Sequence, residues 1–208
     1  MPQAPHEVFL STPSMLGLFD DTALVQGMLD VEAALARAQA QVGLVPPEAA
    51  LTITACANAS RLDVPGIIAA SGRAGTLAIP LVKALTAAVK EASPQAAGFV
   101  HWGGTSQDVV DTAMVLATRR ALELIDADLQ RLIAALLDLA DLHAGTPLLA
   151  RTLMQPAQVI SLGLRLVGWI APLVAAGFFV VAAICAVLFA GSHININGPV
   201  HFEIGRAS

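Results

Sequence analysis

The sequence predicts an all-α fold, in the form of an elongated helical bundle, on three observations. Alanine and leucine supply most of the apolar residues, which make up 56% of the 208 residues, and both residue types favour helix over sheet. Residues 105–143 contain neither proline nor glycine, which predicts one unusually long helix. Apolar side chains within this run recur at steps of three and four, the spacing of a helix packed lengthwise against near-parallel partners; they are Leu122, Ile125, Leu129, Leu132, Leu136 and Leu139.

The first helix is predicted from a cap at residues 20–22 to about Val42, where Gly43 ends it. Its expected inward face consists of apolar residues at helical spacing, namely Leu24, Met28, Val31, Leu35 and Ala38.

Prolines and turn residues predict the next elements. Pro46 and Pro47 suit the first turn of a helix reaching about Asn58, and a short helical piece is expected after Asp63. Residues 71–76 are rich in turn formers and predict a loop. Pro80 then opens a helix over residues 81–92.

The segment His-Trp-Gly-Gly-Thr-Ser-Gln-Asp, residues 101–108, leads into the long helix. Its glycines allow close backbone approach, and Thr105 or Ser106 can cap the helix. Free N–H groups and the positive end of the helix dipole then favour an anion such as a carboxylate. A well-capped helix start is the alternative interpretation of the same residues.

Residues 145–147 predict a turn, and residues 150–158 lead into a further helix opened by a proline. Arg151, Thr152 and Gln155 offer a guanidinium fork and neutral donors to a carboxylate. Arg151 alone is equally compatible with an ion pair to a carboxylate of the bundle.

Residues 166–190 carry no charge, which matches a membrane span in length and composition. A helix buried on all sides of a soluble bundle matches equally well. The start of the sequence has no basic or apolar region of a secretory signal, so we expect a cytoplasmic protein.

Net charge and metal-ligating residue types exclude some functions. The formal net charge of −5 does not suggest a nucleic-acid partner. The two cysteines and five histidines have no metal-ligand spacing, so we expect reduced, buried thiols, no metal and no cofactor.

Taken together, six stretches resemble the fumarase/aspartase superfamily, and within it the 3-carboxy-cis,cis-muconate cycloisomerases of protocatechuate breakdown. They run in family order within about residues 9–173 and comprise residues 10–15, 28–38, 78–85, 101–113, 151–155 and 164–169. The resemblance implies a helical subunit that assembles as a homotetramer, with each active site built from several subunits.

The resemblance also implies which residues bind substrate. His101, Thr105, Ser106 and Gln107 fall in the family's first substrate-binding segment, and Arg151, Thr152 and Gln155 fall in the second. His101 is a candidate proton carrier or a ligand of the substrate, and structural service beside Trp102 is the alternative.

Leu153 stands where the superfamily's lyases have a histidine, which favours ring closure over C–N cleavage. The family's third segment, a Gly-Ser-Ser-x-Met-Pro-x-Lys-x-Asn loop that carries the base, is not found in this sequence.

The resemblance therefore predicts a truncated, cycloisomerase-like chain of the β-ketoadipate pathway that binds a polycarboxylate and is inactive alone. An adenylosuccinate- or argininosuccinate-type lyase and a membrane-attached helical protein are the alternatives. The expected domains are residues 1–104, residues 105–173 as the start of a central bundle, and an atypical apolar tail at 174–208.

Overall fold

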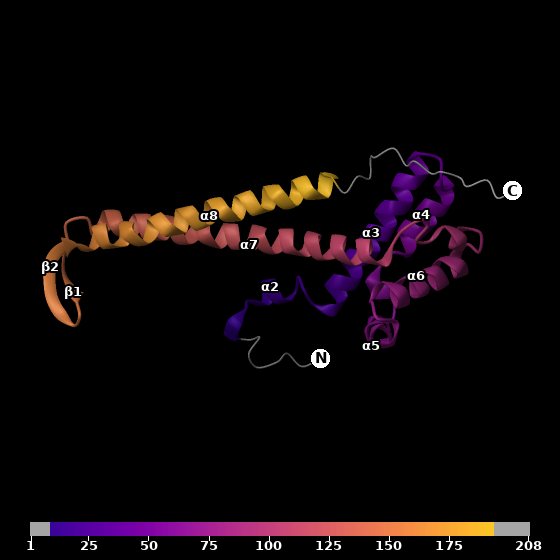
Figure 1. The fold of residues 1–208 in the computed structure, drawn as a ribbon, viewed down its shortest axis with the longest axis horizontal. Coiled ribbons are helices and arrows are strands. Elements are labelled where there is room, and N and C mark those ends of the chain that lie inside the picture. The colour runs from indigo at the N-terminus through magenta and orange to yellow at the C-terminus, as the bar shows by residue number, and fades with distance from the viewer. Residues whose placement is uncertain (1–8, 194–208) are drawn as a thin grey trace. The chain divides into compact units, whose positions relative to one another are not determined.

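The computed structural model describes residues 9–193, with side chains as far as Ala186 (Figure 1). The elements follow in the order α2 (Pro13–Leu16), α3 (Asp21–Gln41), α4 (Pro47–Cys56), η1 (Ala59–Arg61), α5 (Val64–Ala74), α6 (Ala78–Ala92), η2 (Ala96–Phe99), α7 (Ser106–Leu142), β1 (Pro147–Thr152), β2 (Gln155–Ser161) and α8 (Leu162–His193). The predicted helical fold class is confirmed, with one β-hairpin as an exception.

The chain divides into two compact units, one formed by residues up to Thr118 and one by Arg119–Val187. This division falls inside α7, and each unit is described by itself below. The domain boundary predicted between residues 104 and 105 stays a prediction.

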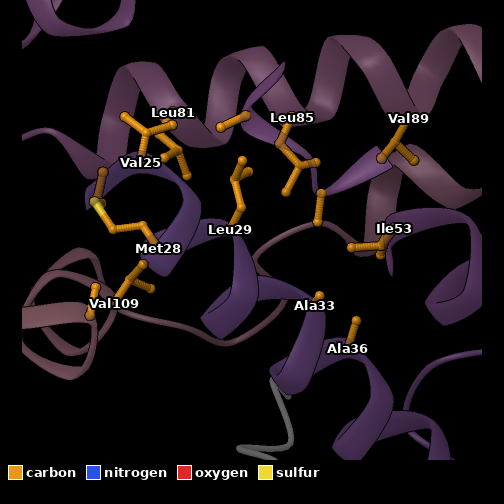
Figure 2. Close-up of a cluster of buried hydrophobic side chains, with 14 of the residues drawn as sticks. Val25, Met28, Leu29, Ala33, Ala36, Ile53, Leu81, Leu85, Val89 and Val109 are labelled. Carbon is orange, nitrogen blue, oxygen red and sulfur yellow. The ribbon is translucent and has the colours of Figure 1, made fainter. Parts of the chain in front are cut away.

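The first unit has its core between α3, α4, α6 and the start of α7 (Figure 2). Met28 and Leu29 of α3 meet Leu81 and Leu85 of α6, and all four side chains are fully buried. Val109 of α7 joins the same cluster. Full burial of such side chains is worth roughly 1.5–3 kcal/mol each, so this core fixes where α7 begins.

The fully buried face of α3 differs from the predicted stripe, although Leu24 and Val31 of that stripe pack against the core at partial burial. The buried residues are Val25, Met28, Leu29, Glu32, Ala33 and Ala36, and only Met28 belongs to the predicted set. Asp20 caps this helix as expected, because its Oδ1 accepts from the Ala23 N–H at 2.7 Å. This difference is important because it places Glu32 on the buried face of α3.

The loop predicted over residues 71–76 is also wrong in its first half. Helix α5 continues to Ala74, and the Ser71 hydroxyl donates to the Ile68 carbonyl instead of forming a turn. Gly75, with φ of 75°, then ends the helix in the left-handed region. Helix α6 starts at Ala78 and ends at Ala92, where the sequence predicted its end.

The second unit consists of the later part of α7, the hairpin and α8. Ala140 of α7 packs with Leu166 and Ile170 of α8. Gly163 permits this contact, because a Cβ there would lie 2.6 Å from the Ala140 carbonyl oxygen. Next to the hairpin, the end of α7 and the start of α8 lie side by side (Figure 1).

Residues 147–161 form the antiparallel pair β1 and β2, so the helix predicted to follow residues 150–158 begins at Leu162, as α8. Thr152 pairs with Gln155, so Leu153 and Met154 form a two-residue turn, and both have positive φ, 45° and 63°. Positive φ at both central residues is what a tight hairpin turn requires. The proline that was expected to open a helix, Pro156, instead lies in β2 opposite Arg151.

Helix α8 is long and apolar enough to cross a membrane over Leu162–Ala186, with a mean hydropathy of 2.3. Only 6% of its most apolar window is buried, so within the described residues α8 is not covered on all sides, as the soluble-bundle alternative would require. Cys185, expected to be buried, is likewise exposed. Residues 194–208 of the predicted apolar tail lie outside the described residues.

Candidate functional site

The candidate site begins with a contact between His101 and α3. His101 Nδ1 lies 2.6 Å from Glu32 Oε1, although 69 positions separate the two residues in the sequence. The side chain of Glu32 is 1% exposed and that of His101 is 19% exposed. The imidazole is therefore held from the inside and is still open to solvent on its other side.

The surroundings of Glu32 disfavour the charged form of its carboxyl group. Burial raises the pKa of the Glu32 carboxyl above its usual 4.5, and the facing His101 offsets part of that rise. Among the residues that the structure describes, Glu32 Oε2 has no hydrogen-bond partner. A buried carboxylate with one free oxygen is unfavourable for stability by itself, which points to a role connected with the histidine.

A second contact from α3 holds the same segment. The Gln39 side-chain N–H donates to the Trp102 carbonyl oxygen at 2.6 Å. Gln39 follows Glu32 by two helical turns, so the two side chains come from one side of the helix. The Trp102 ring also meets Phe99, with 5.9 Å between ring centroids.

The glycines of the segment have different roles. Gly103 has φ of 65°, a left-handed conformation in which a Cβ is strained. At Gly104 a Cβ would approach the His101 ring to 3.1 Å and Leu35 Cδ2 to 3.3 Å. Gly104 therefore leaves the space in which the His101 ring lies.

The predicted residues Thr105, Ser106 and Gln107 stand at the start of α7. Thr105 directly precedes the helix, and its carbonyl accepts from the Val109 N–H at 3.4 Å. Ser106 is the first helical residue and is half-buried. Gln107 is exposed, and its amide donates to Asp111 Oδ1 at 2.8 Å. These residues lie with His101 around one helix N-terminus, which favours an anionic ligand.

The predicted second segment lies in the second unit. Arg151 and Thr152 end β1, Gln155 begins β2, and all three are exposed. The turn between them presents Leu153 and Met154 to solvent, at 93% and 94% exposure. The hairpin thus brings Arg151, Thr152 and Gln155 together, while His101 belongs to the other unit.

Sequence reasoning missed Glu32 and Gln39 as site residues. The signal for Glu32 was a glutamate at helical spacing from Met28, Leu29 and Ala36, which indicates a carboxylate on the buried face. The stripe predicted for α3 placed Glu32 off the inward face. Gln39 carries no comparable signal, because its partner is a backbone carbonyl 63 residues away.

The structure offers no cluster for a metal within the residues that it describes, since no three His, Cys, Asp or Glu side chains gather there. The chemistry available at the site is that of an imidazole, its carboxylate partner, and the donors at the start of α7.

Comparison with known proteins gives the family. A family model described as lyase matches residues 7–176. A 3-carboxy-cis,cis-muconate cycloisomerase of Pseudomonas putida is 46% identical over 162 residues, which is 78% of this chain and 38% of that protein. A nitrosuccinate lyase of Streptomyces davaonensis is 45% identical over 150 residues, 72% of this chain and 32% of that protein. The chain therefore spans about a third of the length of these relatives.

A solved structure agrees with the sequence relatives. The crystal structure of the 3-carboxy-cis,cis-muconate lactonizing enzyme from Pseudomonas putida is similar, with a TM-score of 0.81 and 44% identity, over 84% of this chain and 40% of that one. With a family model that matches most of its length, the chain belongs to the lyase family of the fumarase/aspartase superfamily.

Proposed function

We propose that this chain contributes two substrate-binding segments to a cycloisomerase that closes 3-carboxy-cis,cis-muconate to a lactone, in the cytoplasmic β-ketoadipate pathway. The observation that carries the proposal is the partly exposed imidazole of His101, held by Glu32 beside the N-terminus of α7. The 46% identity with the Pseudomonas putida cycloisomerase supports this substrate in particular.

The proposed chemistry suits such a site. One carboxylate of the substrate adds its oxygen to a conjugated double bond, a C–O bond forms, and the displaced electron pair collects on another carboxylate as an enediolate-like group. A proton then reaches the adjacent carbon. Donors fixed near that carboxylate before reaction lower the barrier electrostatically, and the start of α7 and the Arg151 guanidinium offer such donors.

The direct test is titration of the chain with 3-carboxy-cis,cis-muconate, followed by calorimetry and by NMR of His101. We expect binding by the natural chain and at least a tenfold weaker affinity in Arg151→Ala. Arg73→Ala, which removes an exposed arginine at the end of α5, is the matched control and keeps the affinity. Failure of the tricarboxylate to bind, while the chain is folded, would overturn the proposal.

We also expect binding without turnover, because these 208 residues lack the Ser-Ser-x-Met-Pro-x-Lys segment that the resemblance assigns to the base. Loss of the muconate absorbance in the presence of the purified chain would show that this segment is not needed.

A C–N lyase is the second candidate, favoured by the 45% identity with a nitrosuccinate lyase. Leu153 occupies the position where the resemblance expects a lyase histidine. Formation of a fumarate-type product from a succinyl adduct by the Leu153→His variant, and not by the natural chain, would support this candidate.

A homo-oligomer is proposed as the working form, since several leucines of α7 are more than two-fifths exposed in the single chain; they are Leu132, Leu137, Leu139 and Leu142. Light scattering after size exclusion tests this, with a monomer as the contrary result.

Helix α8 gives reason to keep a membrane partner as an alternative for residues 166–190. Carbonate-resistant membrane association supports a span. Soluble behaviour restored by removing residues after Val174 supports an apolar tail without that role.

A further inference from the structure

We propose that Glu32 is the positioning residue of His101: its carboxylate accepts a hydrogen bond from Nδ1–H and leaves Nε2 as the nitrogen that meets the substrate. The inference deepens the proposed function and rests on it for the identity of the substrate. Glu32 itself touches no substrate in this proposal.

The geometry gives the two ring nitrogens of His101 different roles. Nδ1 is 2.6 Å from Glu32 Oε1, within the range of a charge-assisted hydrogen bond. Above its raised pKa the Glu32 carboxyl is ionised and only accepts, so the proton of this bond then belongs to Nδ1. The other ring nitrogen, Nε2, is then free to exchange a hydrogen bond or proton with a ligand on the exposed side of the ring.

The position of Glu32 is hard to explain as a contribution to stability. It lies at 1% exposure among Met28, Leu29, Ala33 and Ala36, where an apolar residue would pack without losing hydration. Its Oε2 atom has no partner among the described residues. A carboxylate kept in this environment is explained by its one contact, the His101 ring.

Three further features hold the ring in place. His101 has φ of 57°, a conformation that few non-glycine residues adopt and that the surrounding structure must enforce. Gln39 holds the carbonyl of the next residue, Trp102, at 2.6 Å. Gly104 leaves room for the ring where a Cβ would crowd it at 3.1 Å. The imidazole is thus fixed by its side chain and by its backbone.

The test is the tautomer of His101 in the full chain, read from long-range ¹H–¹⁵N correlation spectra between pH 5 and 9. We expect the first proton lost from the imidazolium to leave Nε2, so that the neutral ring carries its proton on Nδ1. In Glu32→Ala this preference is lost and the neutral ring becomes a mixture or the Nε2–H form. Glu48→Ala, which removes an exposed glutamate from the first turn of α4, gives the spectrum of the natural chain.

An Nε2–H ring in the natural chain, or an Nδ1–H ring that persists in a folded Glu32→Ala, would overturn the proposal. The tautomer of His101 in the natural chain tests the proposal by itself. The test therefore remains even if the Glu32→Ala variant fails to fold.

Adding 3-carboxy-cis,cis-muconate separates this inference from the proposed function. We expect the ligand to move the Nε2 signal while the Nδ1 signal stays near its free position, and Glu32→Ala to bind at least tenfold more weakly than Glu48→Ala. Absence of any ligand effect with the Nδ1–H ring present contradicts the proposed substrate alone. A ligand that binds equally well to Glu32→Ala contradicts the positioning role alone.

Discussion

Glu32 and His101 join the middle of α3 to the segment that starts α7, through a contact of 2.6 Å between Oε1 and Nδ1. The Glu32 carboxylate is buried in the helical core and the His101 imidazole is partly exposed. A core residue therefore contacts a side chain that a ligand can approach from solvent. Val100, next to His101, and Val109 of α7 pack against the same buried cluster as Met28 and Leu29, so this core helps to place the His101 ring.

The stability of this arrangement should depend on pH through Glu32. Burial raises the pKa of the Glu32 carboxyl in the folded chain, so its contribution to stability is present below about 4.5 and is lost as pH rises through the raised value. The natural chain should therefore lose stability relative to Glu32→Gln as pH rises above about 4.5 and through the raised pKa of Glu32. Urea unfolding at a series of pH values measures the difference in unfolding free energy between the two chains. Groups that titrate alike in both chains cancel in this difference.

The matched control for that experiment is Glu48→Gln at an exposed position of α4. It removes a carboxyl group that is not buried, so a similar pH-dependent gap for both substitutions would show that burial of Glu32 is not the cause. A pH-independent gap between the natural chain and Glu32→Gln would contradict the expected cause.

Gln39 should stabilise the segment through its bond to the Trp102 carbonyl. Gln39→Leu keeps the size of the side chain and removes the donor, which should cost about 1 kcal/mol of unfolding free energy. Gln41→Leu, at the exposed last residue of α3, should be neutral within about 0.5 kcal/mol. Equal effects of the two substitutions in urea unfolding would show that the Trp102 bond contributes nothing.

Gly104→Ala should displace the His101 ring without changing any charge. The new methyl group would meet the ring at 3.1 Å and Leu35 at 3.3 Å, so one of them must move by a few tenths of an ångström. We expect altered His101 ring signals and weaker tricarboxylate binding. Gly98→Ala is the control, since no atom lies within 4 Å of its added Cβ, and unchanged ring signals in Gly104→Ala would refute the steric argument.

Local signals predicted the helices well, because caps, prolines and apolar spacing act within a few residues. Asp20 and Gly43 mark the limits of α3, and the run without breakers became α7. Glu32 was not identified as a site residue because the predicted stripe of α3 placed it off the buried face and because its partner, His101, lies 69 residues away.

The hairpin could not be predicted for a related reason. Residues 147–161 lack the Asn-Gly or Asp-Gly signal of a tight turn, and the turn is formed by Leu153 and Met154 instead. Arg151 and Gln155 were identified as site candidates from residue type and resemblance, whereas their placement on facing strands comes from strand pairing.

Gly163 should be intolerant of any side chain at the junction of the hairpin with α8. Its added Cβ would lie 2.6 Å from the Ala140 carbonyl oxygen and 2.8 Å from Ala144 Cα, and backbone cannot move aside cheaply. Gly163→Ala should therefore cost about 1–3 kcal/mol. Gly168→Ala, on the same helix with no atom within 4 Å, should instead be neutral or gain up to about 1 kcal/mol.

Opposite signs for these two alanine substitutions, measured by thermal unfolding, would establish that close approach of α7 and α8 at Ala140 is the constraint. A loss of similar size at both positions would mean that helix propensity or aggregation of α8 dominates the measurement.

The turn of the hairpin should be improved by residues that accept positive φ. Leu153 and Met154 have φ of 45° and 63° and are almost fully exposed, so strain there is offset by little local packing. The double variant Leu153→Asn with Met154→Gly supplies the preferred turn sequence and should raise the unfolding free energy by about 1–2 kcal/mol. Leu149→Asn, at an exposed position in β1, is the control and should not stabilise. Hydrogen exchange of the β1 and β2 amides reports the effect locally, and slower exchange is expected in the double variant only. If the double variant exchanges faster, these side chains stabilise the turn through contacts with another molecule, such as a second copy of the chain, and their exposure in the single chain reflects the absence of that partner.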